Sequence, residues 1–267
     1  MTAVTPARGL RGTIRVPGDK SIGHRALFLG ALAEGTTHVA GLSDGDDVAS
    51  TRRCLTALGL DVRDGASRGS IAIEGSAGHL SPPSGVLDCG NSGTTMRLLA
   101  ALLASQPFAA ILDGDASLRS RPMRRIAEPL REMGAQVELS SGDVAPIRIR
   151  GGSLHGIRYT LPIASAQLRT ALIFAGLAAS GTTRLEGKLG ARDHTERMLP
   201  LFGGALELDD GHLTLHGPQR LRAPAAELVV PGDLSSAAYW IAAATIVPGS
   251  RIEIECVGLN PTRIGFI

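Results

Sequence analysis

Four stretches of this chain repeat one order of polar and apolar positions. Each opens with small polar residues, continues as an apolar segment of helical length, and passes through a turn into a short strand. The stretches cover residues 20–42, 91–114, 164–187 and 234–255. Aligned on Ser21, Gly93, Ser165 and Ser235, they follow one another after 72, 72 and 70 residues. This nearly constant period predicts an internal repeat of helix-containing units.

A second pattern lies between these stretches and reaches a glycine each time. Helical segments that end at Gly59, Gly134 and Gly203 pass directly into alternating strands, and further short strands follow near residues 70–74, 147–150 and 212–216. Glycine just past a helix supplies the left-handed residue that terminates it. Each unit is therefore predicted to run strand, helix, strand, helix, strand, strand, which gives an α/β fold with helices packed under sheets.

Three units are complete and end near residue 227, and a fourth begins at "VVPGDLSSAAYW", residues 229–240. The last residues, "NPTRIGFI" at 260–267, are similar to "RDHTERM" at 192–198, where the second helix of unit three opens. We interpret them as the opening of a further helix in a truncated fourth unit. The alternative is that the last unit is simply short and its tail caps the domain.

Composition and charge exclude several classes of protein. The 27 basic and 25 acidic residues give a net charge of +2, too small for a protein that holds nucleic acid through bulk charge. Cys54, Cys89 and Cys256 lack the spacing of a zinc site or a disulfide framework. Apolar runs are too short to cross a bilayer, and the N-terminus lacks the apolar segment of a signal peptide. We expect a cytoplasmic protein that binds neither nucleic acid, membrane nor metal.

The repeated helix starts are candidate anion sites, because a helix N-terminus presents unpaired backbone N–H groups and the positive end of the helix dipole. Arg25, Arg97 and Arg169 follow three of the aligned opening residues by four positions, one helical turn inward. Arginine suits carboxylate and phosphate groups. Packing about a pseudo-threefold axis would bring the starts together in one polar pocket, lined by Lys20, Ser21, Arg25, residues 90–95 and residues 165–167.

Lys20 is unusual for this composition. The chain has 25 arginines and only two lysines, Lys20 and Lys188. Lysine carries a compact ammonium where arginine carries a planar fork. A lysine kept in a loop directly before a helix therefore indicates a task that arginine does not perform.

The arginines have a structural interpretation beside the functional one. Arg25 is either a ligand contact or a helix-surface charge, and Arg97 and Arg169 fit packing positions that support other residues. Pro122 favours a helix start, which would place Arg121 there. The basic run at residues 119–125 equally fits a solvated face.

The acidic residues near these arginines fit helix caps. Asp193 and Glu196, three apart, resemble a capping box, which leaves Arg192 free to face a ligand. Asp46 and Asp47 also fit a helix cap. His194 has no partner at metal-ligand spacing and fits a buried core position.

Seven motifs in order resemble the 5-enolpyruvylshikimate-3-phosphate synthase family. They are "PGDKSIGHRALFLGALAEGTT", "GNSGTTMR", "GDASLRSRPM", "ASAQLRTAL", "RDHTE", "VPGDLSSAAYW" and "NPTRIG". The resemblance implies the enolpyruvyl-transferase fold, an inside-out α/β barrel of βαβαββ units, six of them in two domains. Residues 18–227 would form a complete three-unit domain, and residues 1–17 plus 228–267 would form part of the second domain.

The resemblance also implies an activity and a set of contacts. The family transfers the enolpyruvyl group of phosphoenolpyruvate to the 5-hydroxyl of shikimate 3-phosphate, releases phosphate and uses no cofactor. Lys20 would contact both substrates and stabilise developing charge. Shikimate 3-phosphate would be held by Ser21, Arg25, Ser165, Ala166, Gln167 and Arg192. Phosphoenolpyruvate would be held by Gly93, Arg121 and Gln167, in a loop shaped by Asn91 and Thr94.

The chain departs from the family in what it lacks. The family's general-base aspartate and its remaining phosphoenolpyruvate contacts come from units four to six, and nothing here matches them. We therefore assign no general acid or base and expect the 267-residue chain to be inactive alone, although its parent would be an active monomer. Gly93 implies that the parent is sensitive to glyphosate.

Three other functions fit parts of the pattern. The chain could be a non-catalytic fragment or pseudoenzyme that only binds shikimate 3-phosphate, or a purely structural module. UDP-N-acetylglucosamine enolpyruvyl transferase shares the fold, but it carries asparagine after the loop lysine and a cysteine in a mobile loop. Ser21 stands at the first of these positions, and residues 114–123 contain no cysteine.

Overall fold

The computed structural model describes residues 8–267, so residues 1–7 of the predicted segment 1–17 lie outside the described residues. The first unit contains α1 (Lys20–Leu32), β2 (Thr36–Ala40), α2 (Asp46–Ala57), β3 (Asp61–Asp64) and β4 (Ile71–Glu74). The second contains β5 (Leu87–Asp88), α3 (Gly93–Leu103), β6 (Ala109–Asp113), α4 (Ala116–Arg119), α5 (Arg124–Glu132), β7 (Gln136–Ser140) and β8 (Val144–Arg150).

The third unit has the same plan as the second. It contains β9 (Arg158–Leu161), α6 (Ala166–Ala178), β10 (Gly181–Gly187), α7 (His194–Met198), a 3₁₀ turn (Leu199–Phe202), β11 (Glu207–Asp209) and β12 (His212–Gly217). The remaining elements are β1 (Arg11–Arg15), β13 (Leu228–Val229), α8 (Leu234–Ile246) and β14 (Arg251–Glu255).

The three units form three four-stranded sheets with one strand order. The sheets run β13-β2-β4-β3, β5-β6-β8-β7 and β9-β10-β12-β11. In each, the first two strands are parallel and the others pair antiparallel. The predicted repeat of strand, helix, strand, helix, strand, strand is confirmed by these sheets. The left-handed glycines are also confirmed, since Gly59, Gly134 and Gly203 have φ of 88°, 110° and 74°.

The first position of the first sheet is filled from far along the chain. β13 pairs parallel with β2, matching Leu228 to Val39 and Val229 to Ala40. β1 instead pairs parallel with β14 in a separate two-stranded sheet. Residues 228 and 229, which the sequence grouped with the second segment, therefore complete a sheet of the first unit.

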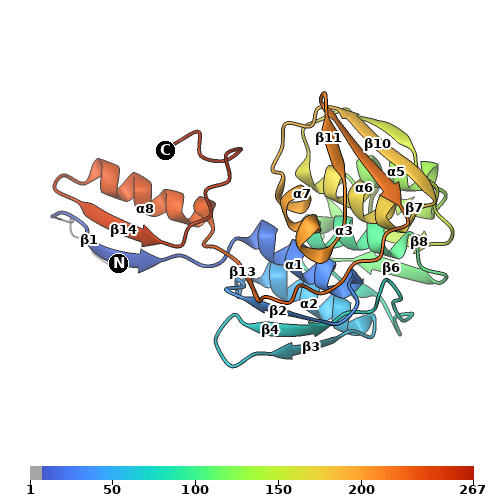
Figure 1. Ribbon diagram of the computed structural model, residues 1–267, viewed down its shortest axis with the longest axis horizontal. Coiled ribbons are helices and arrows are strands. Elements are labelled where there is room, and N and C mark those ends of the chain that lie inside the picture. Colours follow the sequence, from blue (N-terminus) through green and yellow to red (C-terminus); the bar gives the residue numbers. More distant parts are fainter. Residues whose placement is uncertain (1–7) are drawn as a thin grey trace.

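The core lies where α1, α3 and α6 meet. These helices are apolar on nearly all sides and almost wholly buried, and they lie towards the middle of the three sheets (Figure 1). The rings of Phe28 in α1 and Phe174 in α6 pack with centroids 6.0 Å apart. A helix that is hydrophobic all round needs cover on every side, and the three sheets provide that cover.

The chain crosses twice between the three sheets and the small β1–β14 sheet with α8 (Figure 1). α8 is as apolar as α1, but only Leu234 and Ala237 of it are buried, while Tyr239 is 81% exposed. This portion therefore presents an exposed apolar surface. No helix within residues 8–267 has the length and apolar character to span a membrane.

Candidate active site

Three helix starts open onto one cavity of about 310 Å³. The lining residues are Lys20, Ser21, Arg25, Thr94, Ala166, Gln167, Arg192, Asp233, Ser235 and Arg263. Seven of these, all but the last three, are among the site residues predicted from the sequence. The structure thus brings the starts of α1, α3 and α6 together, as the pseudo-threefold packing required.

Each helix start is fixed by a side-chain cap. Asp19, Ser92 and Ser165 accept hydrogen bonds from the backbone N–H three residues on, at 2.9, 3.1 and 3.3 Å. These caps lie 73 residues apart, so the predicted alignment on Ser21, Gly93 and Ser165 is wrong by one or two positions. That alignment matched small residues, whereas the caps mark where the helices begin. The first two N–H groups of each helix have no partner within the helix and remain available to an anion.

Lys20 is held at the cavity by a carboxylate that the sequence analysis assigned elsewhere. Its Nζ lies 2.6 Å from Oδ2 of Asp47. The predicted cap at Asp46 and Asp47 is wrong, because Gly45 precedes α2 and neither carboxylate caps it. The Asp47 carbonyl also accepts a hydrogen bond from Thr95 Oγ1 at 3.2 Å, which ties α2 to α3. Asp47 therefore sets the position of the ammonium.

Arg25 is a buried structural cation at the rear of the cavity, only 2% exposed. It donates to the Ser21 carbonyl at 2.8 Å and to the hydroxyls of Thr170 and Thr195 at 2.7 Å each. Burial lowers its pKa to about 10, which leaves it charged at neutral pH. The helix-surface interpretation of Arg25 is therefore wrong.

Arg192 and Ser21 form a polar pair at the cavity wall. Arg192 Nη1 donates to Ser21 Oγ at 2.7 Å. Because this oxygen already accepts a hydrogen bond, the Ser21 hydroxyl proton is free to donate to a ligand. Arg169 lies behind the pair and donates to the Arg192 carbonyl at 2.7 Å. Arg169 thus supports Arg192, which agrees with the structural interpretation given from the sequence.

Gln167 has an orientation fixed from both ends of its amide. Its Oε1 accepts from Arg97 Nη1 at 2.8 Å and its Nε2 donates to Thr94 Oγ1 at 2.9 Å. Since Thr94 accepts here, its hydroxyl proton can point to a ligand. The pKa of Arg97 is lowered to about 10, mainly by burial and also by the positive charges of Arg125 and Arg121. Arg97 also acts as a support.

Asn91, Gly93 and Arg121 form a second group beside the cavity, outside its lining. Arg121 donates to Asn91 Oδ1 and to Ser117 Oγ, and Asn91 Nδ2 donates to Asp115 Oδ2 at 2.7 Å. A Cβ at Gly93 would lie 2.6 Å from Arg97 Nη1 and 3.3 Å from Arg121 Nη1. The absence of a side chain at Gly93 therefore gives the two guanidinium groups their room.

Two predicted helix features near these groups are wrong. Arg121 does not open a helix, since α5 begins at Arg124 and Arg121 lies in the connection after α4. Asp193 does not form a capping box, because its carboxylate binds Arg197 and Asn260. Ser165, the remaining predicted contact, uses its hydroxyl as the cap of α6.

Glu196 forms a buried ion pair with Arg169. The Nε–Oε1 distance is 2.5 Å, and the side chains are 5% and 11% exposed. Burial raises the pKa of Glu196 while Arg169 opposes this shift. The pair anchors α7 to α6 and so holds the residues before α7, including Arg192, at the cavity.

Two buried histidines sit behind the helix starts. His24 Nδ1 lies 2.7 Å from Thr51 Oγ1, which contacts Thr95 Oγ1 at 2.7 Å, so this polar chain joins α1, α2 and α3. Burial lowers the pKa of His24 to about 3. His194 is buried as its core interpretation predicts, and burial lowers its pKa to about 4. Both side chains are neutral near pH 7.

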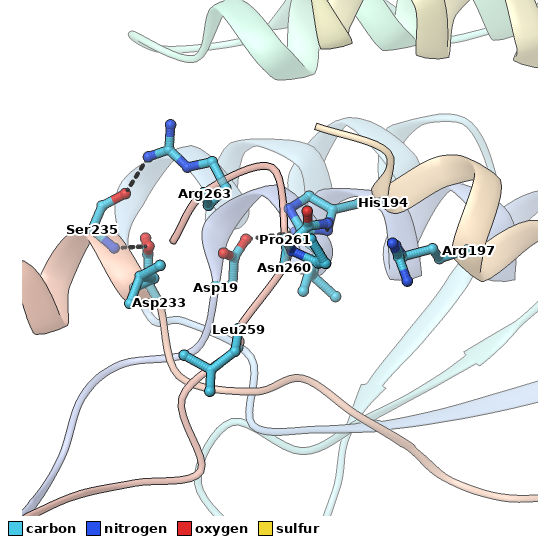
Figure 2. A pocket seen from close by; sticks show the side chains of 12 residues that line it. Asp19, His194, Arg197, Asp233, Ser235, Leu259, Asn260, Pro261 and Arg263 are labelled. Atoms are coloured by element: carbon cyan, nitrogen blue, oxygen red, sulfur yellow. Dashed lines mark hydrogen bonds between the residues drawn. The ribbon is translucent and has the colours of Figure 1, made fainter. Parts of the chain in front are cut away.

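A second cavity of about 200 Å³ lies next to the first, where the chain crosses towards α8 (Figure 2). Its walls include Asp19, His194, Arg197 and Asn260, and it shares Asp233, Ser235 and Arg263 with the first cavity. Asp19 N–H donates to the Pro231 carbonyl, and Asp233 N–H donates to the Pro17 carbonyl. The two crossing segments are thus bonded to each other in a symmetric way.

Asp233, Ser235 and Arg263 line the cavity and were not predicted from the sequence, and neither was Asp47 as the partner of Lys20. One signal was available, since "VPGD" occurs at residues 16–19 and again at 230–233, and both aspartates cap helices. No comparable signal marked Asp47, and the motif "NPTRIG" that contains Arg263 was assigned no ligand contact.

Nearly the whole chain matches a family of known proteins. The sequence model of the family EPSP synthase (3-phosphoshikimate 1-carboxyvinyltransferase) matches residues 4–267. The chain belongs to the EPSP synthase family. Its resemblance to that family, expected from seven motifs, is confirmed.

Individual EPSP synthases show how much of the family this chain covers. It is 49% identical to the 3-phosphoshikimate 1-carboxyvinyltransferase of Geobacillus kaustophilus, over 100% of this chain and 62% of the relative. It is 50% identical to that of Alkalilimnicola ehrlichii, over 99% of this chain and 59% of the relative. An EPSP synthase structure from Acinetobacter baumannii superimposes with a TM-score of 0.89 at 43% identity, over 96% of this chain and 58% of that one. The chain thus spans about three-fifths of these EPSP synthases and has their α/β fold.

Proposed function

We propose that this chain binds shikimate 3-phosphate in the cavity at the starts of α1, α3 and α6. In the full-length EPSP synthase reaction, the enolpyruvyl group of phosphoenolpyruvate passes to the 5-hydroxyl of shikimate 3-phosphate, and phosphate is released. The observation that supports this most strongly is the convergence of three capped helix starts with Lys20, Arg25 and Arg192 on one cavity. A ligand with a phosphate and a carboxylate is the chemistry that such a cavity favours.

The residues of the cavity and of the group beside it are assigned to the two substrates. Ser21, Arg25, Ala166, Gln167 and Arg192 are proposed to hold shikimate 3-phosphate, with Ser165 fixing the α6 N–H groups that meet it. Gly93, Arg121 and Gln167 are proposed to receive phosphoenolpyruvate, with Asn91 and Thr94 shaping that side. Lys20 is proposed to contact both substrates and would stabilise the negative charge that develops during transfer. No redox cofactor is needed for this chemistry.

The arrangement of domains follows the same proposal. The boundary at residue 227 moves to Val229, because β13 completes the first sheet, so we propose that residues 18–229 form the closed domain of an inside-out barrel. Residues 8–17 and 230–267 are proposed to belong to a second domain. The single β1–β14 pair and the exposed α8 support this division. A cytoplasmic location and a monomeric parent remain predictions of the sequence.

Calorimetric titration of the 267-residue chain tests the binding proposal. We expect shikimate 3-phosphate to bind and UDP-N-acetylglucosamine not to bind. Lys20→Met should weaken binding by about 10-fold, the loss of one charge-assisted contact. Lys188→Met, the same change at the other lysine, is exposed and outside the cavity and should have no effect. Equal affinities in both variants would refute the role of Lys20.

Phosphate release distinguishes binding from turnover. With both substrates present, we expect no turnover by the 267-residue chain, because no residue here matches the family's general base. Turnover at a rate typical of an enzyme would contradict this and would place the catalytic groups within residues 1–267. Binding without turnover is also what the fragment or pseudoenzyme alternative requires.

Gly93→Ala should weaken phosphoenolpyruvate binding without unfolding the chain. The added methyl group would displace the Arg97 and Arg121 guanidinium groups, whose flexible ends can move. We expect about 10-fold weaker binding in the presence of shikimate 3-phosphate, as for one lost charged hydrogen bond. Gly152→Ala is the control, because a Cβ there meets nothing within 4 Å. Calorimetry measures the affinity, and thermal melting should match the wild type for both variants.

A further inference from the structure

The first cavity contains a cation that the family motifs did not assign to a ligand. Arg263 lines it on the side opposite the three-sheet domain, beside Ser235 at the start of α8. Its Nη2 donates to Ser235 Oγ at 3.2 Å, and this is the one side-chain hydrogen bond of its guanidinium within residues 8–267. Arginine has five N–H donors, so most of them remain available.

Two other cations of the cavity are more fully engaged than Arg263. Lys20 has a carboxylate partner in Asp47, and Arg25 uses three of its five N–H donors on Ser21, Thr170 and Thr195. Arg192 and Arg263 each use one guanidinium donor, on Ser21 and Ser235, and within the described residues neither has an ion-pair partner. Of these two arginines, Arg263 is the one for which the sequence analysis gave no ligand.

The one carboxylate in the cavity wall does not neutralise Arg263. Asp233 accepts the backbone N–H of Ser235 at 2.8 Å as the cap of α8. Arg263 donates to the hydroxyl oxygen of the same serine (Figure 2). The cavity lining therefore carries four positive charges and one negative charge, which favours a ligand with more than one anionic group.

The backbone that carries Arg263 is built into the site. Asn260 Oδ1 accepts the N–H and hydroxyl of Thr262, and the Arg263 N–H donates to the Asn260 carbonyl. Asn260 Nδ2 donates to Asp193 Oδ1 at 2.6 Å, directly beside Arg192. This turn holds Arg263 between the starts of α7 and α8.

We infer that Arg263 is a further substrate-binding residue, which contacts an anionic oxygen of shikimate 3-phosphate from the side opposite Ser21. This inference rests on the proposed function of the cavity. The contact joins the ligand to the turn at 260–263, so binding also holds α8 against the three-sheet domain. Carboxylate and phosphate share the chemistry that arginine recognises, and the two are separated by experiment.

Titration of the full 267-residue chain with shikimate 3-phosphate and with shikimate tests the inference. Arg263→Gln should weaken shikimate 3-phosphate binding by about 10-fold, the size of one charged hydrogen bond. Arg263→Lys keeps the positive charge but loses the planar guanidinium. Its affinity for shikimate 3-phosphate should fall between those of the wild type and Arg263→Gln. Arg251→Gln removes the same charge from β14, outside the cavity lining, and should bind as the wild type does.

The ligand pair identifies the group that Arg263 meets. Weaker binding of shikimate 3-phosphate alone supports the inference with phosphate as the contact, and weaker binding of both ligands supports it with carboxylate. Hydrogen exchange adds a second readout, since shikimate 3-phosphate should protect residues 258–263 in the wild type and in Arg251→Gln but not in Arg263→Gln. Unchanged affinity and protection in Arg263→Gln overturn this inference alone. Absence of binding to the wild type overturns it together with the proposed function.

Discussion

Glu196→Ala is expected to lower the free energy of unfolding by about 3–5 kcal/mol, the cost of leaving one member of a buried ion pair uncompensated. The Arg169 guanidinium would remain buried without its carboxylate. Because Arg169 also holds the carbonyls of Ala191 and Arg192, the residues before α7 should loosen as well. We therefore expect shikimate 3-phosphate binding to be lost together with stability. Urea unfolding and calorimetry measure the two effects.

An exposed ion pair provides the control for Glu196. Asp61 lies 3.0 Å from Arg63, and both side chains are more than half exposed. Asp61→Ala should change stability by less than about 1 kcal/mol, because water screens such pairs. Glu196→Gln keeps the shape and an acceptor and should cost less than Glu196→Ala. Similar losses for Glu196→Ala and Asp61→Ala would contradict the importance of burial.

Acid should destabilise the chain at a pH well above the range where carboxylates titrate. His24 and His194 have pKa values of about 3 and about 4 in the folded chain, against about 6.5 when unfolded. Between these values the unfolded state binds more protons, so stability is full above pH 6.5 and falls as the pH decreases. Each histidine contributes about 1.4 kcal/mol per pH unit, which predicts a loss of about 2–4 kcal/mol between pH 6 and pH 4.5.

Neighbouring charges act on this pH dependence in known directions. Burial is the main cause of both lowered pKa values. Asp47 acts to raise the pKa of His24, and Asp19 and Asp193 act to raise that of His194. Arg25 adds to the lowering at both histidines. The raised pKa of Glu196 works the other way, because its protonation in the folded state favours folding in acid. Carboxylates with lowered pKa values lose their contribution only at still lower pH.

Urea unfolding at several pH values measures this dependence. The double variant His24→Gln with His194→Gln should lose most of the slope between pH 6 and pH 4.5. His38→Gln, at an exposed position, should retain the wild-type slope. An unchanged slope in the double variant would show that other groups cause the acid sensitivity.

The extent to which the site was predictable depended on whether a residue's role is local. Arg97 and Arg169 were expected either to bind or to support, and the contacts of Gln167 and Arg192 show them supporting. Asp47 was misassigned because two acidic residues before a helix are typical of a cap. Its real partner, Lys20, lies 27 residues away. Such a pairing depends on how α1 packs against α2, which helical periodicity does not specify.

The helix start predicted near Arg121 was also misplaced, because it depends on a contact that is distant in the sequence. Proline favours the first turn of a helix, so the sequence placed a helix start at Pro122. In the structure Met123 precedes α5, and the Met123 N–H donates to the carbonyl of Asp143, in the turn between β7 and β8. A contact with a distant turn thus helps to fix where the helix begins.

The sequence by itself determined the repeated unit, the α/β class, the apolar helices that form the core and the glycines that end three helices. These features follow from local rules of polarity, capping and backbone conformation, and they recur at a fixed spacing along the chain. The tertiary structure decided that β13 completes the first sheet while β1 pairs with β14. Every strand edge offers the same backbone N–H and C=O groups, so the choice of partner belongs to the packing of the whole chain. The same packing brings Asp47 to Lys20, and it brings Ser235 and Arg263 to the cavity that Lys20 lines.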